Sequence, residues 1–248
     1  MTKKVFNKRV LFALLFCLLL NVIKVYVDNK GFAEMYSKGL MTKVSYNEDL
    51  LSGAYYTIVD YAVWQAAVYL IFIEYVMNYN RICYMIRYVN RDEYWKSQIK
   101  NVTKATACFV FVHELVSFFL TIQKGDYKIL MKHNWIQGLF LQFVAANLFY
   151  LCTYLFYEFL RSYFGKSKSN VLIVIIYFVE YVLSRNVLDN FWFPENDVNM
   201  MTKRCVDNMP LLMCFLGIFR LAMEVFIMSR ILSWKKGKED LLIYEKVN

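Results

Sequence analysis

The sequence predicts an all-α integral membrane protein with six transmembrane helices and with its N-terminus and C-terminus in the cytoplasm. Hydrophobic residues make up 59% of the chain and aromatic residues 19%, whereas a soluble domain has about 45–50% apolar residues. The chain has only 2 Pro and 8 Gly, fewer turn-forming residues than a β-barrel or a loop-rich fold contains. Apolar runs of helical length recur along it, and Lys and Arg concentrate in alternate connections.

The first apolar run, residues 10–27, follows the basic leader MTKKVFNKR. It is longer than the core of a signal peptide and no small-residue cleavage site follows it, so we expect an uncleaved span. Lys24 lies near its end, where a lysine can snorkel toward the outer interface. The remaining predicted spans are residues 54–78, 102–122, 135–160, 170–184 and 209–231. All but the short 170–184 suffice to cross a core of about 30 Å, and together the six spans form a single transmembrane domain over residues 1–248.

The distribution of charge predicts the orientation. The inner connections carry 17 Lys and Arg against 5 Asp and Glu, whereas the outer connections carry 9 of each. This asymmetry follows the positive-inside rule and explains the net charge of +9 without a nucleic-acid partner, because the basic residues are spread over four connections. The inner connections are residues 1–9, 79–101, 161–169 and 230–248, and the outer ones are residues 28–53, 123–134 and 185–208.

The six cysteines predict neither a disulfide scaffold nor a metal centre. Four of them, Cys17, Cys108, Cys152 and Cys214, lie inside apolar runs, and no CxxC or CxH spacing occurs. Small apolar packing residues are the simplest interpretation. We therefore expect no bound metal and no cofactor.

The second inner connection, residues 79–101, has the pattern of an amphipathic helix. Apolar residues recur at i, i+3, i+4 and i+7 from Ile82 to Val89, between basic and aromatic residues. One interpretation is an interfacial helix held by anionic lipid. The other is a docking surface for a cytoplasmic partner. Its apolar, basic and aromatic residues include Arg81, Ile82, Met85, Arg87, Arg91 and Trp95.

Residues 85–95, MIRYVNRDEYW, resemble the Ile-Arg-Tyr-x-(Ser/Asn)-Arg…Trp pattern of small ABC-2-type permeases associated with bacteriocin or lantibiotic export and immunity. The resemblance implies six spans, with a short coupling helix between spans two and three that inserts into a separate cytoplasmic ATPase subunit. It also implies a second permease copy, a bacterial plasma membrane and export of an amphipathic or hydrophobic peptide. ATP and magnesium would then be bound by the partner ATPase only.

The same resemblance assigns the coupling contact to Arg81, Ile82, Met85, Arg87, Arg91 and Trp95. It further suggests re-entrant helices after the fifth span, where residues 187–193 are rich in aromatic side chains. An aromatic belt at the outer interface explains those residues equally well.

Charged residues inside the predicted spans are candidate functional groups, because ionisable side chains are costly in a bilayer. The four of interest are Glu74, Glu114, Arg220 and Glu224. Arg220 and Glu224 are spaced i, i+4, so they can neutralise one another on one helix face. Structural pairing within the bundle and a role in gating or in a substrate path both remain open.

No catalytic motif is complete. The stretch from His113 to Ser117 begins like HExxH but ends in serine, and the GKS at residues 165–167 lacks the first glycine and the strand of a P-loop. The chain is therefore expected not to be an enzyme, and active transport would require energy from a partner. Two alternatives remain open: a non-transporting immunity or sensor protein that acts by binding, and an intramembrane peptidase.

Overall fold

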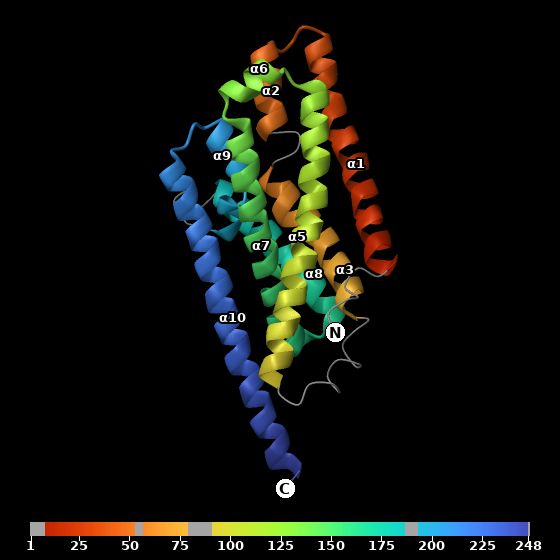
Figure 1. The fold of residues 1–248 in the computed structure, drawn as a ribbon, viewed down its shortest axis with the longest axis vertical. Coiled ribbons are helices and arrows are strands. Elements are labelled where there is room, and N and C mark those ends of the chain that lie inside the picture. The colour runs from red at the N-terminus through yellow and green to blue at the C-terminus, as the bar shows by residue number, and fades with distance from the viewer. Residues whose placement is uncertain (1–7, 53–56, 79–90, 187–192, 248) are drawn as a thin grey trace.

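The fold is a bundle of long helices with shorter helices packed around one end (Figure 1). The computed structural model describes residues 8–52, 57–78, 91–186 and 193–247, and this part of the chain contains helices and no strand. The long helices are α1 (Lys8–Ser37), α5 (Arg91–Lys124), α7 (Trp135–Phe164), α8 (Lys166–Asn186) and α10 (Leu211–Val247). The shorter ones are α2 (Lys43–Ser52), η1 (Asp60–Gln65), α3 (Ala66–Asn78), α6 (Tyr127–Lys132), η2 (Pro194–Asp197) and α9 (Met200–Cys205).

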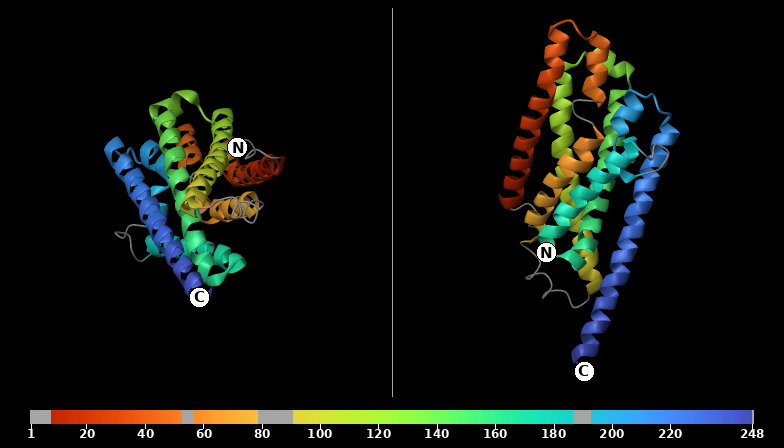
Figure 2. Two further views of the ribbon diagram at one scale, coloured as in Figure 1. Left: turned by 60° about the horizontal axis from the view of Figure 1, so that its bottom comes forward. Right: turned by 180° about the vertical axis from the view of Figure 1, so that it is seen from behind.

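Helix α7 lies at the centre of the bundle. It packs against α10, α9, α5 and α8, and α1 lies beside α5 on the far side. Seen from behind, α3 and α8 cover the face of α7 that α5 leaves open (Figure 2). Ala145, Phe149, Tyr150 and Tyr154 of α7 are buried, so aromatic side chains of a central helix supply much of the core.

Within the described part of the chain, four helices are long and apolar enough to cross a membrane: Trp95–Lys124, Trp135–Phe164, Lys166–Ser184 and Leu211–Lys235. The apolar part of α1, Val10–Lys24, is shorter. The described part of predicted span 54–78 is helical without a break from residue 58 to residue 78, because the π-helix η1 continues directly into the 13-residue α3. The structure therefore agrees with an all-α membrane protein, while the number of six spans stays a prediction.

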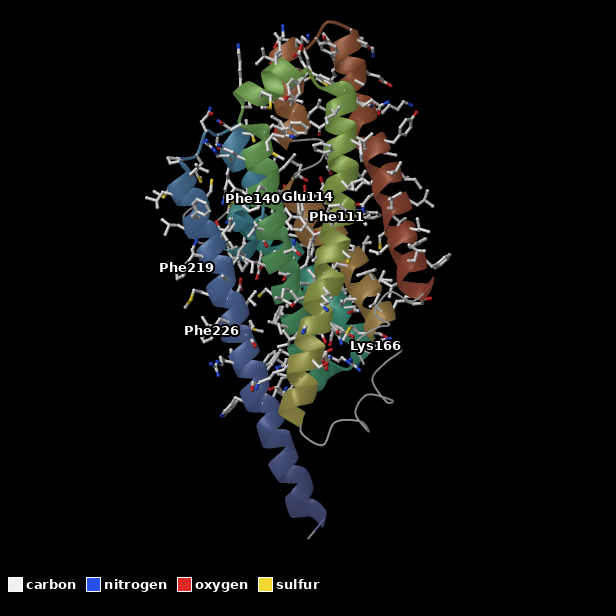
Figure 3. The ribbon with its side chains drawn as sticks, viewed as in Figure 1. Phe111, Glu114, Phe140, Lys166, Phe219 and Phe226 are labelled. Atoms are coloured by element: carbon white, nitrogen blue, oxygen red, sulfur yellow. The ribbon has the colours of Figure 1, made fainter. Side chains whose placement is uncertain are left out.

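Large apolar side chains cover the outside of the bundle. Phe111, Phe140, Phe219 and Phe226 are all more than half exposed, and Figure 3 places them along α5, α7 and α10. A soluble protein rarely exposes so many aromatic residues together. Their exposure is what helices in contact with lipid require.

Helix α5 extends further than the predicted span 102–122. It has 34 residues and begins at Arg91, inside the predicted inner connection 79–101. Residues 91–100 are therefore continuous with the span and form no separate element, while residues 79–90 lie outside the described part of the chain. One continuous helix thus joins the end of the basic connection 79–101 to the middle of the bundle.

Helix α8 is also longer than its predicted span, 170–184, and has 21 residues. It starts one residue after α7 ends, because Gly165 adopts φ 77° and ψ 179°, a conformation that other residues rarely take. The predicted inner connection 161–169 is thus a single-residue turn between two helices. Its basic residues Arg161, Lys166 and Lys168 belong to helices.

Gly138 allows α9 to lie directly against α7. A Cβ atom at this position would overlap Cys205 Sγ and lie 2.7 Å from Met201 Sδ. Both Met201 and Cys205 are fully buried, and α9 contacts α7 closely. The described residues of the predicted outer connection 185–208 therefore fold back onto the bundle.

We expect Gly138→Ala to lower the free energy of unfolding by about 1–3 kcal/mol, because overpacking displaces neighbouring groups. Gly31→Ala is a matched control, since nothing lies within 4 Å of a Cβ there. It should be neutral or stabilising by about 0.5–1 kcal/mol. Thermal unfolding in mild detergent measures both, and equal stability of the two variants would contradict the close approach of α9.

Candidate functional site

A buried polar network joins α1, η1 and α5. The amide oxygen of Asn21 accepts a hydrogen bond from Gln65 Nε2 and lies 3.1 Å from His113 Nδ1. All three side chains are almost completely buried. Polar groups in such surroundings hold helices together, because leaving them unbonded is costly.

Glu114, one of the predicted intramembrane charges, belongs to the same network. Its Oε1 accepts a hydrogen bond of 2.7 Å from the hydroxyl of Tyr61. Tyr150 of α7 donates to the backbone carbonyl of Tyr61 at 3.1 Å. Glu114 is therefore connected to α7 through η1, and Figure 3 places it in the interior of the bundle.

The π-helix η1 brings its polar side chains into the network. Asp60, Tyr61 and Gln65 are buried, whereas Trp64 is half exposed. A π-helix contains an extra residue per turn compared with an α-helix, which rotates the residues that follow. Such turns are rare and often occur at functional sites.

Asp60 at the start of η1 forms an ion pair with Lys24 of α1. Its Oδ2 also accepts a hydrogen bond of 2.7 Å from the hydroxyl of Thr57. The sequence suggested that Lys24 snorkels outward, but in the structure it is largely buried and points to Asp60. The pair fastens α1 to the start of the second predicted span.

The network keeps unused hydrogen-bonding capacity. Asn21 Nδ2, Gln65 Oε1, His113 Nε2 and Glu114 Oε2 are buried and have no hydrogen-bond partner among the described residues. They come from three different elements and include donors and acceptors. Water or a polar group of a ligand could bond to them, and small movements of α1, η1 and α5 could exchange their partners.

Glu74 lies in a second polar cluster, near the turn between α7 and α8. Its Oε1 accepts a 2.6 Å hydrogen bond from the hydroxyl of Tyr157 and lies 3.2 Å from Lys166 Nζ. Asn170 Nδ2 donates to Oε2 at 3.4 Å. These contacts join α3 to α7 and α8, so Glu74 is neutralised within the fold.

Arg220 forms its ion pair with Asp197 of η2. The guanidinium makes two hydrogen bonds, 2.8 Å from Nε to Oδ2 and 2.7 Å from Nη2 to Oδ1. Lys203 adds a contact of 3.0 Å to the same carboxylate. The sequence suggested pairing with Glu224 on the same helix, but the bidentate geometry favours the carboxylate that faces the arginine from another segment.

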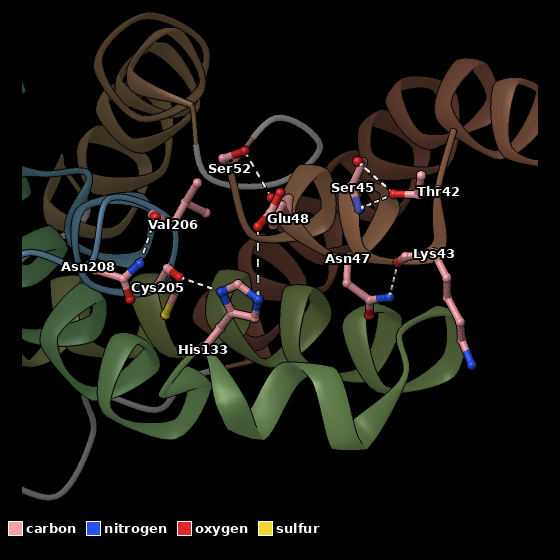
Figure 4. Close-up of polar contacts among 10 residues, drawn as sticks. All are labelled: Thr42, Lys43, Ser45, Asn47, Glu48, Ser52, His133, Cys205, Val206 and Asn208. Atoms are coloured by element: carbon pink, nitrogen blue, oxygen red, sulfur yellow. Dashed lines mark hydrogen bonds and ion pairs between the residues drawn. The ribbon is translucent and has the colours of Figure 1, made fainter. Parts of the chain in front are cut away.

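At the end of the bundle that carries α2 and α6, a group of polar contacts links α2, α6 and α9 (Figure 4). His133 Nδ1 lies 2.8 Å from the carbonyl oxygen of Cys205, and its Nε2 lies 4.0 Å from Glu48 Oε1. Because a carbonyl only accepts, Nδ1 must carry the proton of this bond. His133 therefore bridges two short segments.

Lys43 and Asp126 form an ion pair at the start of α6, whereas His133 follows the end of this helix. Asp126 also accepts from the backbone N–H groups of Lys128 and Ile129, as a helix cap does. The hydrogen bond to Lys43 and these backbone bonds hold the pKa of Asp126 below its usual range. The same bond to Asp126 raises the pKa of Lys43.

The predicted coupling residues are only partly described. Arg81, Ile82, Met85 and Arg87 lie outside the described residues, and Arg91 is the first residue of α5. Trp95 lies one turn further along α5 and is 8% exposed. Its side chain is buried within the bundle, so a partner would reach it only after a local rearrangement.

Comparison with protein-family models, with curated proteins and with solved structures finds no match for this chain. The chain is an all-α membrane protein, and the resemblance to ABC-2-type permeases stays a prediction.

Sequence reasoning found Glu114 but missed most of its network. Asn21 and Gln65 are polar residues inside apolar runs, and that interruption was the available signal. It does not tell which helix supplies the partner. The contact between Asn21 and His113 spans 92 positions of the chain, so only the folded bundle brings the two together.

We expect Lys24→Met to lower the free energy of unfolding by about 3–5 kcal/mol, because it removes the cation from a largely buried carboxylate. The double variant Lys24→Met/Asp60→Asn should recover most of this loss. Unfolding in mild detergent measures the free energy of unfolding of the unchanged protein, of the single variants and of the double variant. Additive losses in the double variant would show that the pair does not join the helices.

The exposed pair Lys43–Asp126 predicts a dependence on pH. Since the folded-state pKa of Asp126 is lowered, its contribution is present above about pH 4 and is lost as the pH falls through the folded-state value. Since the pKa of Lys43 is raised, its contribution is present below about pH 10 and is lost at higher pH.

Asp126→Asn should therefore lower the unfolding temperature at pH 7, and the difference from the unchanged protein should disappear on acidification below about pH 4. Added salt should reduce the difference at pH 7 because it screens exposed charges. Glu34→Gln, at another exposed carboxyl, is the control. A difference that persisted unchanged in acid would exclude this role for the Asp126 charge.

Proposed function

We propose that this chain is the membrane-spanning permease subunit of a bacterial ABC transporter, driven by a separate cytoplasmic ATPase. The basic connection 79–101 is the docking segment, and a second copy of the permease completes the transport pathway. The substrate class that the resemblance suggests is an amphipathic or hydrophobic peptide moved outward. The location is the bacterial plasma membrane.

The observation that carries the proposal is the continuity of α5. One uninterrupted helix runs from Arg91, at the end of the basic connection, to His113 and Glu114 in the polar network. The 23 steps from Arg91 to Glu114 correspond to roughly 35 Å at about 1.5 Å per residue. A force applied by a partner at the cytoplasmic end would reach the centre of the bundle through a rigid element.

A movement of α5 would affect the hydrogen bonds of the polar network, which contains both bonded and unpartnered polar atoms. Movement of α5 relative to α1 and η1 would break the contact between His113 and Asn21 and offer the unused atoms of Gln65 and Glu114 in exchange. Alternative hydrogen-bond partners would allow the helices a second arrangement in this part of the bundle. Opening and closing of a pathway is the change that such an arrangement supports.

The proposed topology has six spans with both ends in the cytoplasm. Helix α1 begins and α10 ends toward the same lower end of the bundle in Figure 1, as an even number of crossings requires. The predicted inner connections 161–169 and 230–248 supply the basic residues Arg161, Lys166, Lys168, Arg230 and Lys235, and Figure 3 places Lys166 toward this lower end. The segment formed by η2 and α9, which packs on α7 and α10, would be the re-entrant part on the outer side.

The test is purification of the full chain from its native membranes in mild detergent, with mass spectrometry of the proteins that accompany it. We expect an ATPase to co-purify, and we expect Arg87→Glu/Arg91→Glu to reduce its yield at least tenfold. Lys124→Glu/Lys128→Glu, which reverses two charges at the other end of α5 and in α6, should leave the yield unchanged.

Absence of any ATPase from the unchanged protein in several detergents would overturn the proposal in favour of a protein that acts by binding alone. Equal loss in both charge-reversed variants would show a general effect of charge and would remove the docking role of residues 79–101.

A further inference from the structure

A cluster of carboxyl groups lies on the side of α7 opposite to α5. It contains Glu180 of α8, Glu195 of η2 and Glu224 of α10. Glu180 interacts with both of the others, and Glu224 lies within hydrogen-bonding reach of Cys152 of α7. Side chains of four elements, α7, α8, η2 and α10, therefore meet at this acidic cluster.

Glu195 is the most deeply buried member of the cluster. Its side chain is 0% exposed, and neither carboxyl oxygen has a hydrogen-bond donor among the described residues. Oε2 of Glu180 and Oε2 of Glu224 are likewise buried and without a partner. A completely buried carboxylate with no donor is not stable, so the structure needs an additional group at this position.

The contact between Glu180 and Glu195 identifies that group. Their side chains lie within hydrogen-bonding reach of one another. Two ionised carboxylates are both acceptors, so they bond only when a proton lies between them. One shared proton supplies the missing donor and removes the repulsion of two adjacent charges.

The charges that surround the pair also require protons. Asp197 of η2 faces the cluster and holds Arg220 and Lys203 at its own carboxylate, and the hydroxyl of Tyr177 and the thiol of Cys152 complete the wall. These groups place four carboxyls beside two cations. Among the described groups, full ionisation would leave two negative charges uncompensated.

The described side chains of this cluster do not form a metal site. Among the described residues no group of three or more His, Cys, Asp or Glu side chains is arranged to hold one. A proton shared by two facing carboxyl oxygens needs no further ligand.

We propose that Glu180 and Glu195 form a proton-binding site in which the two carboxyls share one proton between α8 and η2. Loss of the proton places two anions side by side and separates η2 from α8. Because Asp197 of η2 holds Arg220 of α10, the separation is transmitted to α10. Proton binding thereby controls how this segment sits on the bundle, independently of any ATPase.

Infrared difference spectroscopy of the purified full chain at pH 7 tests the shared proton. The spectrum of the unchanged protein minus that of Glu195→Gln should contain the carbonyl band of a protonated carboxylic acid, and Glu180→Gln should remove the same band. Glu34→Gln, at an exposed carboxyl, should leave it in place. A difference spectrum with only ionised-carboxylate bands would overturn the proposal.

Dicyclohexylcarbodiimide provides a second test on the unchanged protein, so the result does not depend on folding of a variant. The reagent adds to protonated carboxyls in apolar surroundings and forms a stable N-acylurea that peptide mass spectrometry locates. We expect labelling of Glu180 or Glu195 at pH 7, which falls about tenfold per pH unit once the pair titrates. Absence of label at both residues at pH 6, with no acid band in the infrared spectrum, would exclude the site.

Discussion

Polar side chains inside this bundle must find their hydrogen-bond partners on neighbouring helices, because a hydrocarbon surrounding supplies none. This requirement governs how the helices are connected. The pair Lys24–Asp60 fastens α1 to η1, and Glu114 binds η1 to α5 through Tyr61. Asp197 and Arg220 do the same for η2 and α10. Lipid-like apolar surfaces alone would leave the relative rotation of these helices undefined.

Two buried polar regions of the bundle differ in which hydrogen-bonding atoms lack a partner among the described residues. The network around Asn21 and His113 has spare donors and acceptors, so it can exchange partners without a change in charge. The pair Glu180–Glu195 consists of acceptors only, so its state depends on protonation. The network around Asn21 and His113 can therefore respond to the movement of a helix. The pair Glu180–Glu195 can respond to the binding or loss of a proton.

Helix α7 separates and connects these two places. Tyr150 faces η1 on one side, where it bonds to the carbonyl of Tyr61, and Cys152 faces Glu224 on the other. Thr153 of α7 shares a hydrogen bond of 2.9 Å with Tyr177 of α8. A displacement of α5 and a proton bound near α8 would therefore act on the same central helix, through residues less than one turn apart.

The sequence by itself determined the class of the fold, because apolar composition, helical length and charge asymmetry are properties of local stretches. It also identified Glu74, Glu114, Arg220 and Glu224 as unusual, since a charge within an apolar run is visible without a structure. The partners could not be found in this way. Arg220 has Glu224 as its neighbour in sequence but Asp197 as its bonded partner in space.

The same limit explains Lys24 and the carboxyl pair. Lys24 can snorkel outward when considered alone, and only the approach of η1 supplies Asp60 as an ion-pair partner. Glu195 lies in a connection that the sequence places outside the bundle, and only packing of η2 and α9 on α7 buries it beside Glu180. Local composition decides which segments become helices, whereas long-range packing decides which polar groups meet, because partners far apart along the chain leave no pattern in either stretch alone.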